Sequence, residues 1–89
     1  MPRLEYSDRF AEDLARLTSA KVEARVYAAL DNVGAFGNFG SRVVPDSIRR
    51  DFGEGVRKVV VGPFDLVYTY YPAEDLVRIE ALIHQRAAR

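Results

Sequence analysis

The chain has 89 residues, of which 48% are hydrophobic, which suits one globular domain spanning residues 1–89 and leaves no room for a second. It has no cysteine and only one histidine, which excludes disulfides and thiolate zinc sites and argues against an imidazole site, so we expect no metal and no cofactor. The 13 basic and 13 acidic side chains cancel, so binding to nucleic acid through general electrostatic attraction is not expected.

The N-terminal stretch MPRLEYSDRF has no apolar segment of the kind that a signal peptide carries. No apolar run in the chain is long enough for a membrane span. We therefore expect a cytoplasmic protein that does not contact a membrane.

Two helices are predicted after a short first strand at Arg3–Tyr6. Apolar residues at helical spacing predict the first helix over Asp8–Leu17, with Ser7 as its N-cap. The second helix follows Ser19 and should stop at Gly34, and its apolar stripe is Val22, Val26, Leu30 and Val33. Because the link between the helices is short, they should form an antiparallel hairpin.

The segment from Gly34 to Gly55 holds five glycines and one proline and is the least regular part of the chain. Asp46 is a candidate cap for one helical turn over Ser47–Phe52. Its three phenylalanines are expected to hold the segment against the core: Phe36, Phe39 and Phe52.

Three strands are predicted at Val56–Val61, Phe64–Tyr71 and Leu76–Ile83. The turns between them are short, so neighbouring strands should be antiparallel. The predicted fold class is α+β, with an N-terminal strand and an antiparallel helix hairpin packed on one face of a mainly antiparallel four-stranded sheet.

Alternation along the strands sorts their side chains into two faces. The almost wholly apolar face, expected to pack on the helices, carries Val59, Val61, Phe64, Leu66, Tyr68, Tyr70, Val77, Ile79, Ala81 and Ile83. The other face carries Val56, Lys58, Val60, Asp65, Val67, Thr69, Tyr71, Leu76, Arg78, Glu80 and Leu82. A core face would not hold four charges, so this second face is expected to be open. On it, Asp65 and Lys58 are placed to form a diagonal cross-strand ion pair worth about a few tenths of a kcal/mol.

The C-terminal block VRKVVVGPFDLVYTYYPAEDLVRIEALIHQR, Val56 to Arg86, resembles the RelE/ParE superfamily of bacterial toxins from type II toxin–antitoxin pairs. The matching pattern is a basic-apolar strand, a Gly-aromatic turn, an L-V-Y strand, an acidic turn and a final apolar strand. SDRFAEDLARL, Ser7 to Leu17, looks like the first helix of that family. The resemblance covers most of the chain, with residues 34–55 unmatched.

In the messenger-cleaving members, the resemblance implies a basic catalytic set on the open sheet face. Lys58, His84 and Arg86 stand where such residues are placed, and they are the catalytic candidates if this protein is an mRNA endonuclease. Asp65 stands where an arginine is usual, and the terminal tyrosine of several members is absent. His84 is otherwise a surface residue at a strand end.

Cleavage of RNA needs a base, an acid and cationic stabilisation of the phosphorane. A carboxylate at Asp65, with Glu80 on the same face, would repel the scissile phosphate. The resemblance therefore favours a ParE-like activity, a growth-inhibiting action on DNA gyrase through binding. A ribosome-dependent mRNA endonuclease and a toxin-like domain without activity remain as alternatives.

The resemblance also implies a cognate antitoxin, which would wrap an extended or helical segment around the toxin, and a role in plasmid stabilisation. Contact with operator DNA would come only through the antitoxin. The expected antitoxin-binding or target-binding residues lie on the predicted open face, which is too apolar to stay bare. They are Lys58, Asp65, Val67, Tyr71, Arg78, Glu80 and Leu82.

Overall fold

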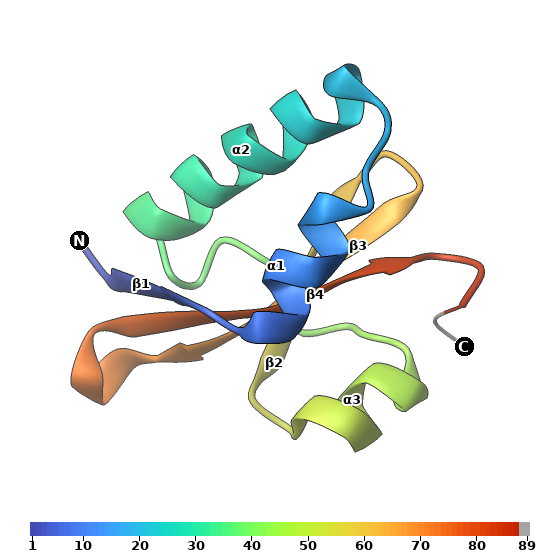
Figure 1. Ribbon diagram of the computed structural model, residues 1–89. Helices are drawn as coiled ribbons and strands as arrows, with labels where there is room; N and C mark the ends of the chain where they lie inside the picture. The colour runs from blue at the N-terminus through green and yellow to red at the C-terminus, as the bar shows by residue number, and fades with distance from the viewer. Residues whose placement is uncertain (88–89) are drawn as a thin grey trace.

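The computed structural model describes residues 1–87 (Figure 1). Its elements, in chain order, are β1 (Arg3–Tyr6), α1 (Asp8–Ala15), α2 (Ala20–Ala35), α3 (Asp46–Phe52), β2 (Val56–Val61), β3 (Phe64–Tyr71), a 3-10 turn (Pro72–Glu74) and β4 (Leu76–His84). The strands form one sheet in the order β1-β4-β3-β2. β1 runs parallel to β4, and the other neighbours are antiparallel. The predicted α+β fold class is confirmed.

The helix starts follow the sequence prediction more closely than the helix ends. Ser7 and Ser19 accept hydrogen bonds from the backbone N–H groups of Phe10 and Val22, as N-caps do. α1 ends at Ala15, two residues before the predicted end, and α2 runs through Gly34. Gly34 therefore lies inside the last turn of α2, one residue before its end, and a Cβ there would lie 3.4 Å from Leu4 Cδ1.

Helices α1 and α2 cover one face of the sheet (Figure 1) and enclose the larger core. Leu66 and Ile79, predicted to point at these helices, are both fully buried. The buried members of this core are Phe10, Val26, Ala29, Leu30, Val33, Val61, Leu66, Tyr68, Val77, Ile79 and Leu82.

A β-bulge in β4 corrects the predicted faces of its last residues. Val67 pairs with Ala81 while the next residue, Tyr68, pairs with Ile79, so Glu80 is an extra residue in β4. From this point the alternation is reversed. Leu82 therefore packs in the core beneath α1 and α2, whereas Ala81 and Ile83 face the opposite side, contrary to the prediction.

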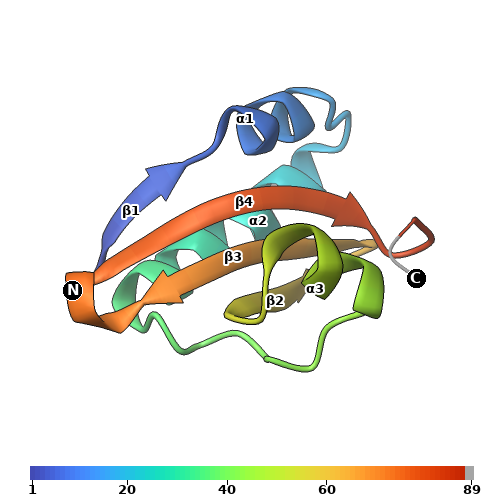
Figure 2. The ribbon, with the colours of Figure 1, turned by 90° about the horizontal axis from the view of Figure 1, so that it is seen from below.

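The second face of the sheet is not open along its length, because α3 lies across it (Figure 2). Ile48 of α3 is 1% exposed and packs in a second core with Val56, Val67 and Ala81. The expected open face is therefore wrong where α3 covers Val56, Val67 and Ala81. The N-cap of α3 is Pro45 rather than Asp46, and no side chain caps the helix.

Tyr68 holds the segment between α2 and α3 against the sheet. Its buried hydroxyl accepts a hydrogen bond from Gly40 N–H at 2.6 Å and donates one to Gly37 O at 2.8 Å. A Cβ on Gly40 would lie 2.7 Å from the Tyr68 ring and 2.8 Å from a backbone oxygen, so only glycine fits there. Phe36 and Phe39, the residues expected to make this attachment, are instead exposed. Phe52 does pack on the second core, as predicted.

Helix α1 closes the edge of β4 beyond the end of β1. Asp13 Oδ2 accepts the backbone N–H of Leu82 at 3.0 Å, and Ser7 Oγ donates to Glu80 O at 2.6 Å. Arg9 and Arg16 lie 3.6 and 3.8 Å from the Asp13 carboxylate. A helix side chain thus replaces the strand that would otherwise pair there.

Candidate functional site

Asp65 lies at the start of β3, directly after the turn from β2, and is the most deeply buried charged residue of the described chain, 1% exposed. Its Oδ2 is 3.6 Å from Lys58 Nζ on β2, and its Oδ1 accepts a hydrogen bond from Gln85 Nε2 at 3.2 Å. The diagonal pair predicted for Asp65 and Lys58 is confirmed. The predicted exposure of Asp65 is wrong, because the side chain is buried in the middle of the sheet, with Val60 of β2 and Ile83 of β4 as its cross-strand neighbours.

Gln85 is a member of this cluster that the sequence reasoning missed. Its backbone N–H donates to Pro63 O at 2.8 Å, which ties the end of β4 to the β2–β3 turn. Strand alternation without the bulge places Gln85 with Ile83 on the side opposite Asp65, and only the extra residue at Glu80 brings the two side chains to the same side.

The three catalytic candidates do not share one side of the sheet. His84 pairs with Phe64, and their rings meet edge to face at 5.3 Å on the side of α1 and α2. Lys58 points to the other side, where α3 lies. His84 Nδ1 accepts the backbone N–H of Arg86 at 3.1 Å, which places the proton of a neutral ring on Nε2. Arg86 is exposed just past the end of β4.

The remaining predicted binding residues are also divided. Val67 is fully buried beneath α3, and Leu82 is buried on the opposite face. Tyr71 and Arg78 are accessible at the β1 end of the sheet.

A chain of ion pairs crosses this accessible end. Arg78 Nε lies 3.0 Å from Glu80 and its NH1 lies 3.9 Å from Glu5, which in turn lies 3.8 Å from Arg3. Thr69 donates a hydrogen bond to the second oxygen of Glu80. Each positive charge of this strip is matched by a carboxylate, so the strip offers no surplus cation to a phosphate.

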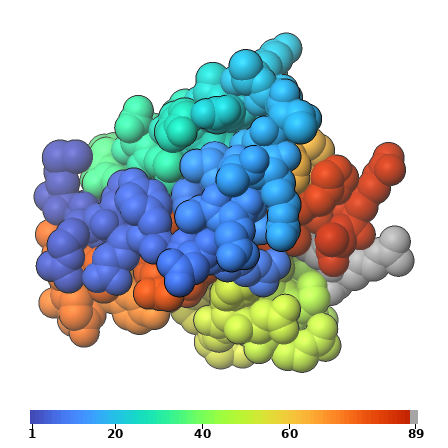
Figure 3. Space-filling model, viewed as in Figure 1, coloured from blue at the N-terminus to red at the C-terminus, as the bar shows by residue number. Residues whose placement is uncertain are grey.

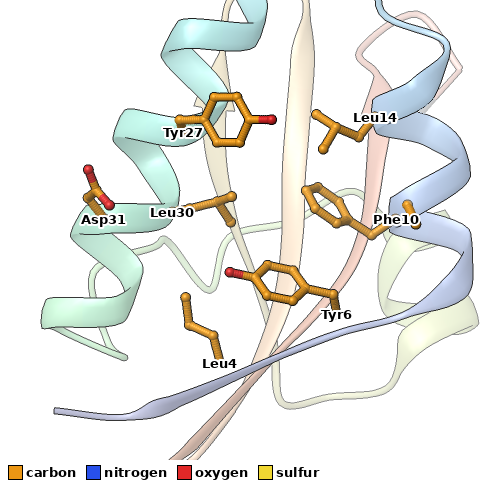
Figure 4. Close-up of a pocket in the computed structure, with 8 residues that line it drawn as sticks. Leu4, Tyr6, Phe10, Leu14, Tyr27, Leu30 and Asp31 are labelled. Carbon is orange, nitrogen blue, oxygen red and sulfur yellow. The ribbon is translucent and has the colours of Figure 1, made fainter.

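An apolar groove of about 370 Å³ opens between β1, α1 and α2 (Figure 4). The helices run in opposite directions along its two sides, as the hairpin prediction required. Its lining residues are Leu4, Tyr6, Phe10, Ala11, Leu14, Tyr27, Leu30 and Asp31. The rings of Tyr6 and Phe10 stack with their centroids 5.9 Å apart and form its floor at one end. The groove is suited to apolar side chains of a partner.

Comparison of the fold with solved structures gives matches over nearly the whole chain. The toxin–antitoxin complex RelBE of E. coli contains a chain with a TM-score of 0.71 and 15% sequence identity, covering 94% of this chain and 96% of that chain. This chain has the RelE fold. The isolated E. coli RelE toxin matches with the same TM-score and identity, covering 94% of this chain and 84% of that one. A mutant of E. coli RelE in complex with an antitoxin RelBc peptide has a TM-score of 0.68 and 13% identity, covering 93% of this chain and 82% of that one.

No protein-family model and no curated protein matches the sequence. The RelE fold of this chain is therefore identified from the order and packing of its elements and not from sequence similarity. Within residues 1–87, no helix is long and apolar enough to cross a membrane. The same residues contain no group of three or more potential metal-ligating side chains.

Proposed function

We propose that this protein is the toxin of a type II toxin–antitoxin pair, inhibiting growth until a cognate antitoxin neutralises it. The observation that carries the proposal is a RelE fold that spans both this chain and the RelE chain of the RelBE complex almost completely. Two of the matching structures hold an antitoxin beside the toxin, which supports an antitoxin partner here.

For the target, we propose a ParE-like action on DNA gyrase through binding. RNA cleavage would need free cations around the scissile phosphate. The Lys58 ammonium is instead paired with a buried carboxylate, and Arg78 lies between two glutamates. The imidazole of His84 is on the other side of the sheet from Lys58. These features count against a phosphate site on this face.

The second candidate function is a ribosome-dependent mRNA endonuclease. It is favoured by one observation, that the matching structures are of RelE, which the resemblance places among the messenger-cleaving members. Under this alternative, Lys58 and Arg86 contact the RNA backbone, and Asp65 fixes the position of the Lys58 ammonium.

The antitoxin contact is proposed for the accessible predicted residues, with the apolar groove receiving side chains of its helical or extended segment. Tyr71 and Arg78 lie on one side of the sheet, and the groove lies on the other. An antitoxin that reaches both must wrap around the β1 edge of the sheet.

The deciding experiment is expression of the protein without antitoxin, with chromosomal DNA damage and messenger integrity followed in the same culture. The ParE-like proposal expects growth arrest with signs of DNA breakage and intact messengers. When the amounts of soluble protein are matched, Lys58→Ala should leave this arrest largely unchanged. Arg50→Ala, which replaces an exposed arginine on α3, should do the same. Rapid messenger loss that Lys58→Ala abolishes and Arg50→Ala does not would establish the endonuclease instead.

A further inference from the structure

The outer edge of β1 has backbone groups directed away from the sheet. Arg3 N–H donates to Asp75 O at 2.8 Å and Ser7 N–H donates to Ile79 O at 3.0 Å, so the odd-numbered residues of this stretch face β4. The N–H and C=O groups of Leu4 and Tyr6 therefore point outward. An edge with such groups is a template for a further strand.

The other edges of the sheet are covered in part. The backbone of Ser41 pairs with Lys58 on the outer side of β2, with both N···O distances at 2.9 Å. The edge of β4 past β1 is occupied by Asp13 of α1. Among residues 1–87, no segment pairs with the outer side of β1, which lies at the surface in Figure 3 and at the border of the sheet in Figure 2.

The charges of β1 single out one way for two copies of the strand to pair. Arg3 and Glu5 point to the same side of the sheet, where Glu5 contacts Arg78. Antiparallel pairing of outward-facing backbone groups requires even-numbered residues to stand opposite one another. With Leu4 opposite Leu4 of a second copy, Arg3 stands opposite Glu5 in both directions. A shift of two residues either way sets Arg3 against Arg3, or Glu5 against Glu5, and like charges directly opposite are destabilising.

We propose that β1 pairs antiparallel with β1 of a second copy of this chain, joining two four-stranded sheets into one continuous sheet with a two-fold axis at Leu4. Such an interface is isologous and closes on itself. Pro2 has no N–H group to donate to a neighbouring strand. The backbone pairing is therefore confined to the stretch in which Arg3 of one copy stands opposite Glu5 of the other.

The side of β1 opposite the charges supports the same partner. Leu4 packs on Gly34 at the floor of the groove, and Tyr6 beside it is 53% exposed. In the proposed pairing, Leu4 meets Leu4 of the second copy, and Tyr6 of the second copy stands over Pro2 near Met1, which is 93% exposed. The dimer would therefore shield apolar surface that the single chain exposes. This self-association does not require the protein to be toxic, but it uses the β1 edge around which the proposed antitoxin would wrap, so the second copy and the antitoxin would exclude one another there.

The test is sedimentation equilibrium of the full chain over a range of concentrations, with a charge-swap cycle on β1. Arg3→Glu alone and Glu5→Arg alone should each raise the dimer dissociation constant about tenfold or more, because each sets like charges opposite one another twice. The double variant Arg3→Glu/Glu5→Arg restores opposite charges across the axis and should return the constant to within about threefold of the parent. Arg50→Glu, a charge reversal on exposed α3, is the matched control and should change nothing.

Amide exchange gives a second measurement that needs no variant. The outward N–H of Leu4 should exchange more slowly as protein concentration rises, while the N–H of Val43, exposed on a loop far along the chain, should not respond. A parent protein that stays monomeric up to about 1 mM overturns the proposal. So does a dimer whose stability is indifferent to all three β1 variants.

Discussion

The buried pair of Lys58 and Asp65 makes a quantitative prediction about the stability of this fold. Lys58→Met removes the ammonium and leaves the Asp65 carboxylate buried, with only the Gln85 amide as a donor. Removing one partner of a fully buried pair costs about 3–5 kcal/mol. Because the Lys58 side chain is 22% exposed and water reaches part of the pair, we expect the free energy of unfolding to fall by about 2–3 kcal/mol.

The double variant Lys58→Met/Asp65→Leu separates the cost of an unpaired charge from the cost of lost packing. Apolar neighbours such as Val60 and Ile83 flank Asp65, so a leucine there replaces a charge by an apolar group. Its unfolding free energy should return to within about 1 kcal/mol of the parent. Urea unfolding, followed by circular dichroism, measures all three proteins. A Lys58→Met cost below about 0.5 kcal/mol, or a double variant as unstable as the single one, would refute the reasoning.

Other substitutions test the rest of the fold. Burial raises the pKa of Tyr68 above its ordinary value of 10.0, so the stability that its neutral hydroxyl provides is complete below about pH 10 and is lost as the pH rises through the raised pKa. Tyr68→Phe should cost about 2 kcal/mol in urea unfolding at neutral pH and should lack this alkaline loss. Leu66→Asp puts an unpaired charge in the main core, and its circular dichroism spectrum should be that of an unfolded chain. Asp65→Arg should lower the melting temperature sharply, because the site is buried beside Lys58, and a melt like the parent's would contradict the assigned burial. Asp13→Ala leaves a β4 N–H unpaired and should cost about 1–2 kcal/mol in thermal unfolding, whereas a neutral effect would show that α1 does not seal that edge.

The regular elements could be predicted because their signals are local. Period-two alternation located β2 and β3 within a residue, and a serine before each of the first two helices located their starts. The bulge at Glu80 has no such signal. It depends on the register that β3 and β4 adopt together and on the hydrogen bond from Ser7 to the Glu80 carbonyl, which joins residues 73 positions apart.

The candidate site was harder to predict because it depends on what covers the sheet. The sequence placed Lys58, Asp65 and Val67 on one face correctly, but the burial of Val67 was set by α3, whose buried Ile48 packs with it in the second core. Four charges on that face suggested contact with water. Instead, the charged residues pair with one another along the sheet, and Asp65 is buried with its partner.

The position of β4 in the sheet has a consequence for how the protein matures. The last strand to be synthesised lies between the first strand and the rest of the sheet, and it contributes Val77, Ile79 and Leu82 to the main core. Until β4 leaves the ribosome, β1 has no neighbour and the β2–β3 hairpin is separated from it. Non-local pairing of this kind is slow compared with helix or hairpin formation. We therefore expect the nascent chain to remain without a closed core until β4 has left the ribosome, so that any partner made alongside it meets an incomplete fold first.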